Sequence, residues 1–271
     1  MSGLKETTLR NATAILIGFV ALAGAVASHG ASAEARCAKQ SPAHAVALLE
    51  LYTSEGCNSC PPADRWLSRI ARDGPGPDRV VPLAFHVDYW DRLGWKDRFG
   101  SPRFTDRQTA LARRAGSRAV YTPGVFLNFA EFRGWATTRF DEALRAINGK
   151  PARADIRLEL DWLAAAQLAI TADFRLKSGA PESAQAFVAL YEQRLSTDVK
   201  AGENRGVTLQ HDYVVREWIG PIEIKGSATL RRTLALERDW KFGDLGMTAF
   251  VQDTGGGEVM QATSLAVCGQ G

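Results

Sequence analysis

Two cysteines separated by two residues, Cys57 and Cys60, have the spacing in this chain that points most directly to chemistry. They follow an apolar run at residues 46–53 that reads as a buried strand, and they precede a segment of helical periodicity. A Cys-x-x-Cys pair between a strand and a helix is typical of reversible dithiol–disulfide exchange. In such a pair the first cysteine is the more exposed, so we expect Cys57 to attack and Cys60 to resolve the mixed disulfide. The alternative is a permanently oxidised, inert bond.

The start of the helix decides how reactive Cys57 is. If Cys57 is the N-cap, unpaired backbone N–H groups and the helix dipole stabilise its thiolate, but Pro61 and Pro62 then each remove an early helical hydrogen bond. If Cys60 is the N-cap, Pro61 takes the first helical position, where proline is favoured, and Cys57 moves into the preceding turn. The sequence leaves both arrangements open.

The elements that position this pair are predicted from hydrophobic periodicity. Together they give the order strand, helix, strand, helix, strand, strand, helix, which builds a small mixed sheet covered by helices. This order resembles that of thioredoxin, where the dithiol follows the first strand and a proline opens the third. The predicted strands are at residues 46–53, 80–87, directly after residue 123 and at 131–135, and the predicted helices are at 63–70, 105–115 and 138–147.

The resemblance to thioredoxin assigns roles to three further residues. In that fold the proline at this position, here Pro123, is cis and lies against the dithiol, so that the preceding Thr122 offers hydrogen bonds to an extended partner chain. The alternative is an ordinary trans proline at a strand start. Thioredoxins also carry a buried acid on the first strand that helps to move the proton of the resolving thiol, and Glu50 is the candidate here. Alternatively, Glu50 reaches solvent or pairs with an arginine.

Aromatic residues next to these elements suggest a surface for docking a partner. Tyr121 directly precedes Thr122, and Trp90 and Trp95 lie in an aromatic and charged loop after the second predicted strand. These side chains are candidates for a groove beside the dithiol. Equally, they cover the edge of the sheet.

Metal binding is not indicated. His86, Asp88 and Asp91 at the end of the second predicted strand suggest a hydrogen-bonded histidine–aspartate pair. A zinc site built on Cys57, Cys60 and His86 lacks the second paired cluster that structural zinc sites use, so no metal and no cofactor are predicted.

The first 33 residues have the pattern of a secretory signal peptide. Lys5 and Arg10 precede an apolar run at residues 12–27, and Ala31-Ser32-Ala33 forms a small-residue cleavage site. This run is shorter than the roughly 20 residues that span a membrane, which disfavours the alternative of a membrane anchor. No later apolar run is long enough to span, so we expect a periplasmic or secreted protein with no membrane span after cleavage.

The other two cysteines, Cys37 and Cys268, lie near the two ends of the chain that cleavage would leave. An even number of cysteines in an oxidising compartment favours disulfides. We therefore predict a structural Cys37–Cys268 bond, with about 5 kcal/mol as its upper contribution to stability on the chain-entropy model. Two free thiols are the alternative. The formal net charge of +3 gives no reason to expect nucleic acid or a membrane surface as a partner.

The pattern of the chain changes after Pro151. Apolar and charged residues alternate with a period of two at residues 154–161, and similar alternation recurs downstream between turn signals. Six or more short strands without helical stretches indicate a mainly antiparallel β-sandwich of immunoglobulin-like type. The predicted parts are a signal peptide at residues 1–33, a thioredoxin-like α/β domain at 34–150 and a β-sandwich domain at 151–271.

Four segments together resemble one known family: ELYTSEGCNSCPPAD at residues 50–64, HVDYWD at 86–91, GWKD at 94–97 and YTP at 121–123. This is the secreted bacterial domain-of-unknown-function family 1223, placed in the thioredoxin-like superfamily. The resemblance covers the chain from about residue 46 to the C-terminus. It implies a thioredoxin-like fold and export but no substrate, and the thioredoxin roles carry over only to Cys57, Cys60 and Pro123.

These observations predict an exported thiol–disulfide oxidoreductase-like protein. Cys57 attacks, Cys60 resolves, and the partners are protein or small-molecule thiols and disulfides. The alternative is a non-catalytic binding module on a thioredoxin-like scaffold, in which the Cys57–Cys60 bond is structural.

Overall fold

The computed structural model describes residues 37–117 and 119–269, and the predicted signal peptide at residues 1–33 lies outside them. In this part of the chain, no helix is long and apolar enough to cross a membrane. The helices are α1 (Pro61–Asp73), α2 (Pro102–Arg114) and α3 (Arg139–Asn148), with 3₁₀ turns η1 (Asp91–Leu93) and η2 (Phe242–Asp244). The strands are β1 (Cys37–Gln40), β2 (Ala47–Thr53), β3 (Val80–His86), β4 (Gly124–Leu127), β5 (Ala130–Glu131), β6 (Ala154–Ala164), β7 (Gln167–Leu176), β8 (Ala184–Glu192), β9 (Leu195–Asp198), β10 (Thr208–His211), β11 (Val214–Ile224), β12 (Ser227–Ala235), β13 (Leu245–Asp253) and β14 (Val259–Ala266).

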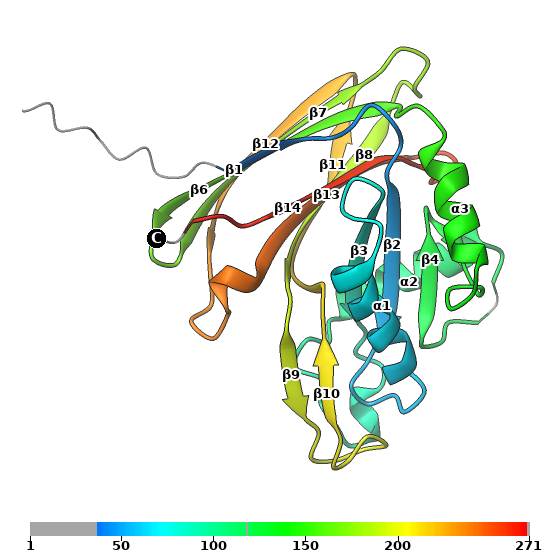
Figure 1. The fold of residues 1–271 in the computed structure, drawn as a ribbon, viewed down its shortest axis with the longest axis vertical. Helices are drawn as coiled ribbons and strands as arrows, with labels where there is room; N and C mark the ends of the chain where they lie inside the picture. The colour runs from blue at the N-terminus through cyan, green and yellow to red at the C-terminus, as the bar shows by residue number, and fades with distance from the viewer. Residues whose placement is uncertain (1–36, 118, 270–271) are drawn as a thin grey trace, which may run out of the picture. The chain divides into compact units, whose positions relative to one another are not determined.

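The largest sheet has eight strands in the order β14-β13-β8-β11-β3-β2-β4-β5 (Figure 1). Near one end, β2 pairs parallel with β3 and antiparallel with β4. β11 pairs parallel with β3 and thereby joins strands of the second half of the chain to those of the first. The sequence predicts a domain boundary at residues 150–151. In the structure the described segments on either side of it share this sheet and belong to one compact unit.

A four-stranded antiparallel sheet, in the order β1-β6-β7-β12, packs on β8, β11, β13 and β14 of the larger sheet. The period-two pattern accounts for this layer, because alternate residues of β6 such as Ile156 and Leu158 are buried in the shared core. β1, which the sequence assigns to the first domain, pairs with β6 instead, and Cys37 at its start forms a disulfide with Cys268. The second layer of this sandwich is therefore part of the larger sheet, not a sheet of its own.

Helices cover the two faces of the sheet around β2. Leu49 and Leu51 pack on α1 and α3, whereas Tyr52, which points the opposite way, packs on the side that α2 covers. α1 suits its place because Trp66 and Leu67 form part of one apolar side that faces the sheet. The dithiol and α2 therefore lie on opposite sides of β2.

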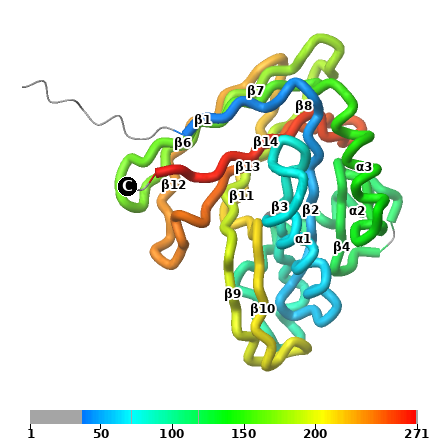
Figure 2. The backbone as a smooth tube through the Cα atoms, in the orientation of Figure 1, coloured from blue at the N-terminus to red at the C-terminus, as the bar shows by residue number. Residues whose placement is uncertain are grey.

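Short strands account for the main differences from the predicted elements. The predicted fourth strand at residues 131–135 is only the two-residue β5. β9 and β10 have four residues each and form a separate two-stranded hairpin, which hydrophobic periodicity does not predict. Figure 2 shows this hairpin beside α1 and the segment that leads into it.

Arg107 of α2 is a buried cation on the face that α2 covers. Its guanidinium forms a two-point ion pair with Glu50 of β2, at 2.7 and 2.8 Å, and Tyr52 donates its hydroxyl to the same carboxylate at 2.8 Å. Burial acts to lower the pKa of Arg107, but the Glu50 carboxylate and the Tyr52 hydroxyl together outweigh burial and raise that pKa. The guanidinium carbon also lies 4.9–5.9 Å from the centres of four aromatic rings on β3, β8, β11 and β13: Phe85, Phe187, Trp218 and Phe250.

Replacing this cation should destabilise the protein. We expect Arg107→Met to lower the free energy of unfolding by about 3–5 kcal/mol, because it leaves the buried Glu50 carboxylate without its partner. The double variant Glu50→Gln/Arg107→Met should recover part of that loss, since it removes both charges. Urea denaturation measures both variants, and a double variant less stable than Arg107→Met would show that the loss has another cause.

Candidate functional site

Cys57 and Cys60 form a disulfide at the N-terminus of α1. Cys60 is the N-cap and Pro61 the first helical residue, so the second of the two arrangements that the sequence allows is the one observed. Cys57 lies in the preceding turn, where its N–H donates to the carbonyl of Ser54 at 3.1 Å and its carbonyl accepts from the N–H of Cys60 at 3.3 Å. The helix dipole thus acts more directly on Cys60 than on Cys57.

Both cysteines are fully buried. Each is 0% exposed, whereas Asn58 and Ser59 between them are exposed, so the expectation that Cys57 is the more exposed cysteine is wrong for the disulfide form. The hydroxyl of Ser59 lies 3.3 Å from Sγ of Cys57 and donates to the carbonyl of Thr122 at 3.5 Å. One exposed side chain therefore links the dithiol turn, residues 55–60, to the segment before Pro123.

The Thr122–Pro123 peptide bond is cis, the isomer expected from the resemblance to thioredoxin. Thr122 accepts a hydrogen bond on its hydroxyl oxygen from the indole N–H of Trp90 at 2.8 Å. Tyr121 is 39% exposed on the same segment. The structure thus places Trp90 and Thr122 next to the dithiol turn and leaves Tyr121 accessible beside them.

Glu50 is not brought to the disulfide. Its carboxylate is 0% exposed and is bound to Arg107 on the α2 side of the sheet, whereas the disulfide lies at the start of α1 on the other side. Of the alternatives that the sequence leaves open for Glu50, pairing with an arginine is the one observed.

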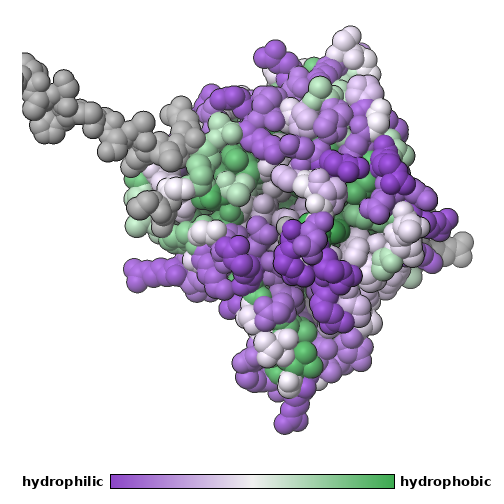
Figure 3. Space-filling model, viewed as in Figure 1, coloured by the Kyte–Doolittle hydropathy of each residue, from purple (hydrophilic) through white to green (hydrophobic). Residues whose placement is uncertain are grey.

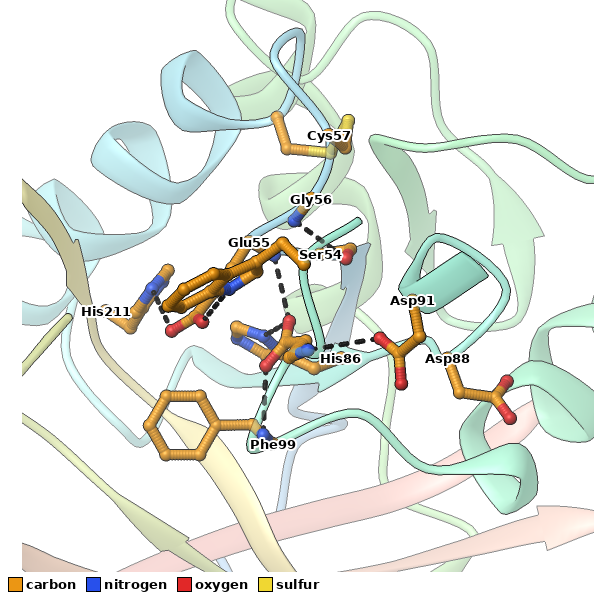
Figure 4. A network of polar contacts seen from close by, with 12 residues as sticks. Ser54, Glu55, Gly56, Cys57, His86, Asp88, Asp91, Phe99 and His211 are labelled. Carbon is orange, nitrogen blue, oxygen red and sulfur yellow. Dashed lines mark hydrogen bonds and ion pairs between the residues drawn. A yellow bond between two sulfur atoms is a disulfide. The ribbon is translucent and has the colours of Figure 1, made fainter. Parts of the chain in front are cut away.

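Next to the dithiol turn lie five buried ionisable side chains, here called the buried cluster, of which Figure 4 labels Glu55, His86 and His211. Glu55 accepts the indole N–H of Trp95 at 2.8 Å, and its other carboxylate oxygen lies 3.5 Å from Nε2 of His211. Nδ1 of His86 lies 2.7 Å from Oδ2 of Asp97, which also accepts the N–H of Glu55 at 2.8 Å. The members are at most 6% exposed: Glu55, Asp64, His86, Asp97 and His211.

The predicted histidine–aspartate pair has a different acid from those expected. His86 pairs with Asp97, not with Asp88 or Asp91. Asp88 accepts a hydrogen bond from the hydroxyl of Thr105 at 2.6 Å, and Asp91 accepts the N–H of Asp97 at 3.1 Å. Among the described residues, no group of three or more His, Cys, Asp or Glu side chains is arranged to hold a metal ion.

Contacts between neighbours shift the pKa values of His86, Asp97 and Glu55 in the buried cluster. Burial acts to lower the pKa of His86 and to raise that of Asp97. Their mutual contact, together with the nearby Asp64 and Glu55 carboxylates for His86 and the backbone N–H groups of Glu55 and Phe99 for Asp97, raises the pKa of His86 and lowers that of Asp97. Burial also acts to raise the pKa of Glu55, but the contacts with His211 and Trp95 help to lower it. The carboxylates of Asp97 and Glu55 therefore stay ionised and hold the backbone that leads into the dithiol turn.

The loop of the β9–β10 hairpin, residues 199–207, lies against the dithiol turn. The side-chain amide of Asn204 donates to the carbonyl oxygens of Glu55 at 2.8 Å and of Cys57 at 2.9 Å. The N–H of Asn58 donates to the carboxylate of Glu203 at 3.1 Å. The sequence does not identify these two residues as part of the site. The signal available was the pair of glycines that flank them, residues 202 and 206, which is typical of a turn.

Comparison with known proteins gives a family and two solved relatives. A family model described as "Protein of unknown function (DUF1223)" matches residues 48–252. A protein from Agrobacterium tumefaciens, known from its crystal structure, is 27% identical in sequence to this chain. The match covers 82% of this chain and 95% of the Agrobacterium chain, with a TM-score of 0.60. HBP35 of Porphyromonas gingivalis is 16% identical, covers 83% of this chain and 76% of its own, and has a TM-score of 0.62. No curated protein matches the chain.

The His86–Asp97 pair predicts a pH dependence of stability. Because the folded-state pKa of His86 is raised, the stabilisation is fully present below the unfolded value of about 6.5 and is lost as the pH rises through the folded value. Because that of Asp97 is lowered, the stabilisation is present above the unfolded value of about 3.9 and is lost as the pH falls through the folded value.

The difference in free energy of unfolding between the protein and its Asp97→Asn variant should therefore be largest between about pH 4 and 6.5. Urea denaturation across this range and up to about pH 9 measures it. A difference that increases above neutral pH would contradict a charged pair.

Proposed function

Since this chain belongs to the DUF1223 family, whose description names no activity, we propose its function from the site: it is an exported thiol–disulfide exchange protein that uses Cys57 and Cys60. The observation that carries the proposal is a Cys-x-x-Cys disulfide at a helix N-terminus that is linked through Ser59 to the segment ending in the cis Pro123. In this arrangement a partner chain bound along Thr122 would present its sulfur to Cys57.

The order of elements supports a thioredoxin-like assignment for the first half of the chain. β2, α1, β3, α2, β4, β5 and α3 follow one another, and their strands lie in the order β3-β2-β4-β5. β2 and β3 are parallel, and β4 and β5 are antiparallel to their neighbours. β11 extends this sheet beyond β3, so the thioredoxin-like part is continuous with the β-rich part.

The exchange is balanced without a cofactor. When the protein oxidises a partner, a partner thiolate attacks Sγ of Cys57, the Cys57–Cys60 bond breaks, and Cys60 leaves as a thiolate that takes up a proton. A second partner thiolate then attacks the mixed disulfide and releases Cys57, so that two electrons pass from the partner to the protein. Reduction of a partner disulfide is the same sequence in reverse, with Cys57 attacking and Cys60 resolving.

Two disulfides support a periplasmic or secreted location, because such bonds persist in oxidising compartments. The signal peptide predicted at residues 1–33 agrees with this location.

Exposed apolar side chains support a protein partner over a small thiol. Of the five large hydrophobic side chains that are exposed in the described residues, four lie on η1 or on loops around the dithiol turn or the hairpin: Leu93, Val120, Tyr121 and Val207. Figure 3 shows apolar surface between hydrophilic residues at the end of the molecule where the hairpin lies in Figure 1. Apolar surface of this kind suits an extended polypeptide.

The burial of Cys57 and Cys60 favours a second candidate function, a binding module in which this disulfide is fixed. In that case a partner binds to the exposed loops, and the disulfide only stabilises the dithiol turn.

Redox titration separates the two candidates. A potential between about −120 and −270 mV for Cys57–Cys60 is expected for an exchange protein, whereas a value below about −300 mV is typical of a structural bond. Under the first function, the Cys60→Ser variant should also trap a mixed disulfide with an oxidised protein substrate through Cys57. The matched control is Cys57→Ser/Cys60→Ser. A potential below about −300 mV together with no trapped adduct would reject the exchange function and favour the binding module.

A further inference from the structure

The β9–β10 hairpin lies outside the thioredoxin-like order of elements and yet contacts the dithiol turn. It is inserted between β8 and β11, and its two strands pair only with each other. In Figures 1 and 2 it extends beside α1 and away from the sandwich. A hairpin that adds nothing to either large sheet needs another reason for its position.

Asn204 at the hairpin loop holds the backbone of the dithiol turn. Its side chain is 5% exposed, and its amide donates to the carbonyl oxygens on both sides of Gly56, those of Glu55 and Cys57. A buried amide with two backbone acceptors in reach restricts the movement of the segment that carries them. Any displacement of Cys57 toward an incoming thiolate therefore has to break these bonds or carry the loop along.

Glu203, the neighbouring residue, brings a negative charge to the dithiol turn. Its carboxylate accepts the N–H of Asn58, the residue directly after Cys57, at 3.1 Å. In this position it occupies the backbone donor of the residue after Cys57, and its negative charge disfavours a thiolate on Cys57. The acid within the turn itself, Glu55, points away from the sulfur toward His211 (Figure 4).

The hairpin is held in place by close packing as well as by hydrogen bonds. Gly202 has a φ of +72°, and a Cβ added there would lie 3.1 Å from Cβ of Trp95, so this position favours glycine on both grounds. Trp95 in turn donates to Glu55, and His211 of β10 contacts the same carboxylate. The loop, the dithiol turn and the buried cluster thus form one connected unit.

We propose that the loop at residues 199–207 is a cover on the dithiol turn, in which Asn204 limits the attack of thiols on Cys57 and Glu203 favours the disulfide over the dithiol. This inference rests on the proposed exchange function and assigns two positioning residues to it. The loop slows exchange until it moves aside, and the carboxylate makes Cys57–Cys60 a weaker oxidant than the same turn without that charge. A partner that displaces the loop therefore meets a more reactive pair.

The role of Glu203 is tested with Glu203→Gln, because glutamine keeps an acceptor for Asn58 and removes only the charge. In a Cys60→Ser background, where Cys57 is a free thiol, the midpoint of the pH profile of Cys57 alkylation by iodoacetamide should fall by roughly 0.5–1 pH unit. With both cysteines present, the dithiol fraction at a fixed ratio of reduced to oxidised glutathione should rise. The matched control is Asp198→Asn, which removes an exposed carboxylate from β9 of the same hairpin.

The role of Asn204 is tested by the rate at which dithiothreitol reduces Cys57–Cys60 in the folded protein. Loss of two hydrogen bonds should make Asn204→Ala react roughly five- to tenfold faster. The matched control is Asn148→Ala. Asn148 also donates to two backbone carbonyl oxygens, those of Ala45 and Arg79, at the end of α3.

An unchanged alkylation midpoint in Glu203→Gln, or an equal shift in Asp198→Asn, would overturn the role of Glu203. If dithiothreitol reduces Cys57–Cys60 at the same rate in Asn204→Ala and in the unsubstituted protein, the role of Asn204 is overturned. The same holds if dithiothreitol reduces this bond in neither protein. These readouts do not depend on a biological partner. If the potential lies in the range typical of a structural bond and no mixed disulfide is trapped, but both shifts occur, the exchange function fails and the cover stands. If adducts form and neither shift occurs, the exchange function stands and the cover fails.

Discussion

The ion pair between Arg107 and Glu50 is the constraint on which the rest of the structure depends. The eight-stranded sheet combines strands from two distant stretches of the chain. On the face that α2 covers, these strands need side-chain contacts that hold them together. Arg107 supplies some of these contacts, because its guanidinium contacts Glu50 on β2 and aromatic rings on β3, β11, β8 and β13. These are five adjacent strands of the sheet. With Glu50 turned toward α2, Leu49 and Leu51 must face α1, and β2 then delivers the dithiol turn to the start of that helix.

The Cys-x-x-Cys motif of Cys57 and Cys60 is typical of reactive cysteines, but both side chains are buried. We proposed exchange for the disulfide at the start of α1, yet neither cysteine is accessible. Ser59 closes the side toward Thr122, the buried cluster fixes Glu55, and Asn204 holds the carbonyl of Cys57. Because each of these contacts belongs to a different element, the reactivity of Cys57 is a property of the whole arrangement and not of the four-residue motif.

Local features could be predicted from the sequence, whereas choices between distant partners could not. β2, α1 and β3 follow from periodicity, and the partner of Cys37 follows from the number and placement of the cysteines. The face on which Glu50 lies depends on α2, and the selection of Asp97 by His86 depends on how a loop folds. The hairpin has strands of four residues, too short for a periodic signal, so Glu203 and Asn204 were missed. The sheet shared across residue 150 depends on β11 pairing with β3, which neither segment encodes alone.

The distance along the chain between the dithiol and its cover has a consequence for biogenesis. Asn204 follows Cys57 by 147 residues, and β11, which closes the sheet beside β3, comes later still. A chain that emerges from its N-terminus during synthesis or export therefore presents both cysteines before the hairpin has been delivered. If the two cysteines are oxidised at that stage, the hairpin does not yet contact them. The hairpin packs on the dithiol turn after the disulfide has formed. The order of emergence thus allows this disulfide to form before the hairpin contacts it.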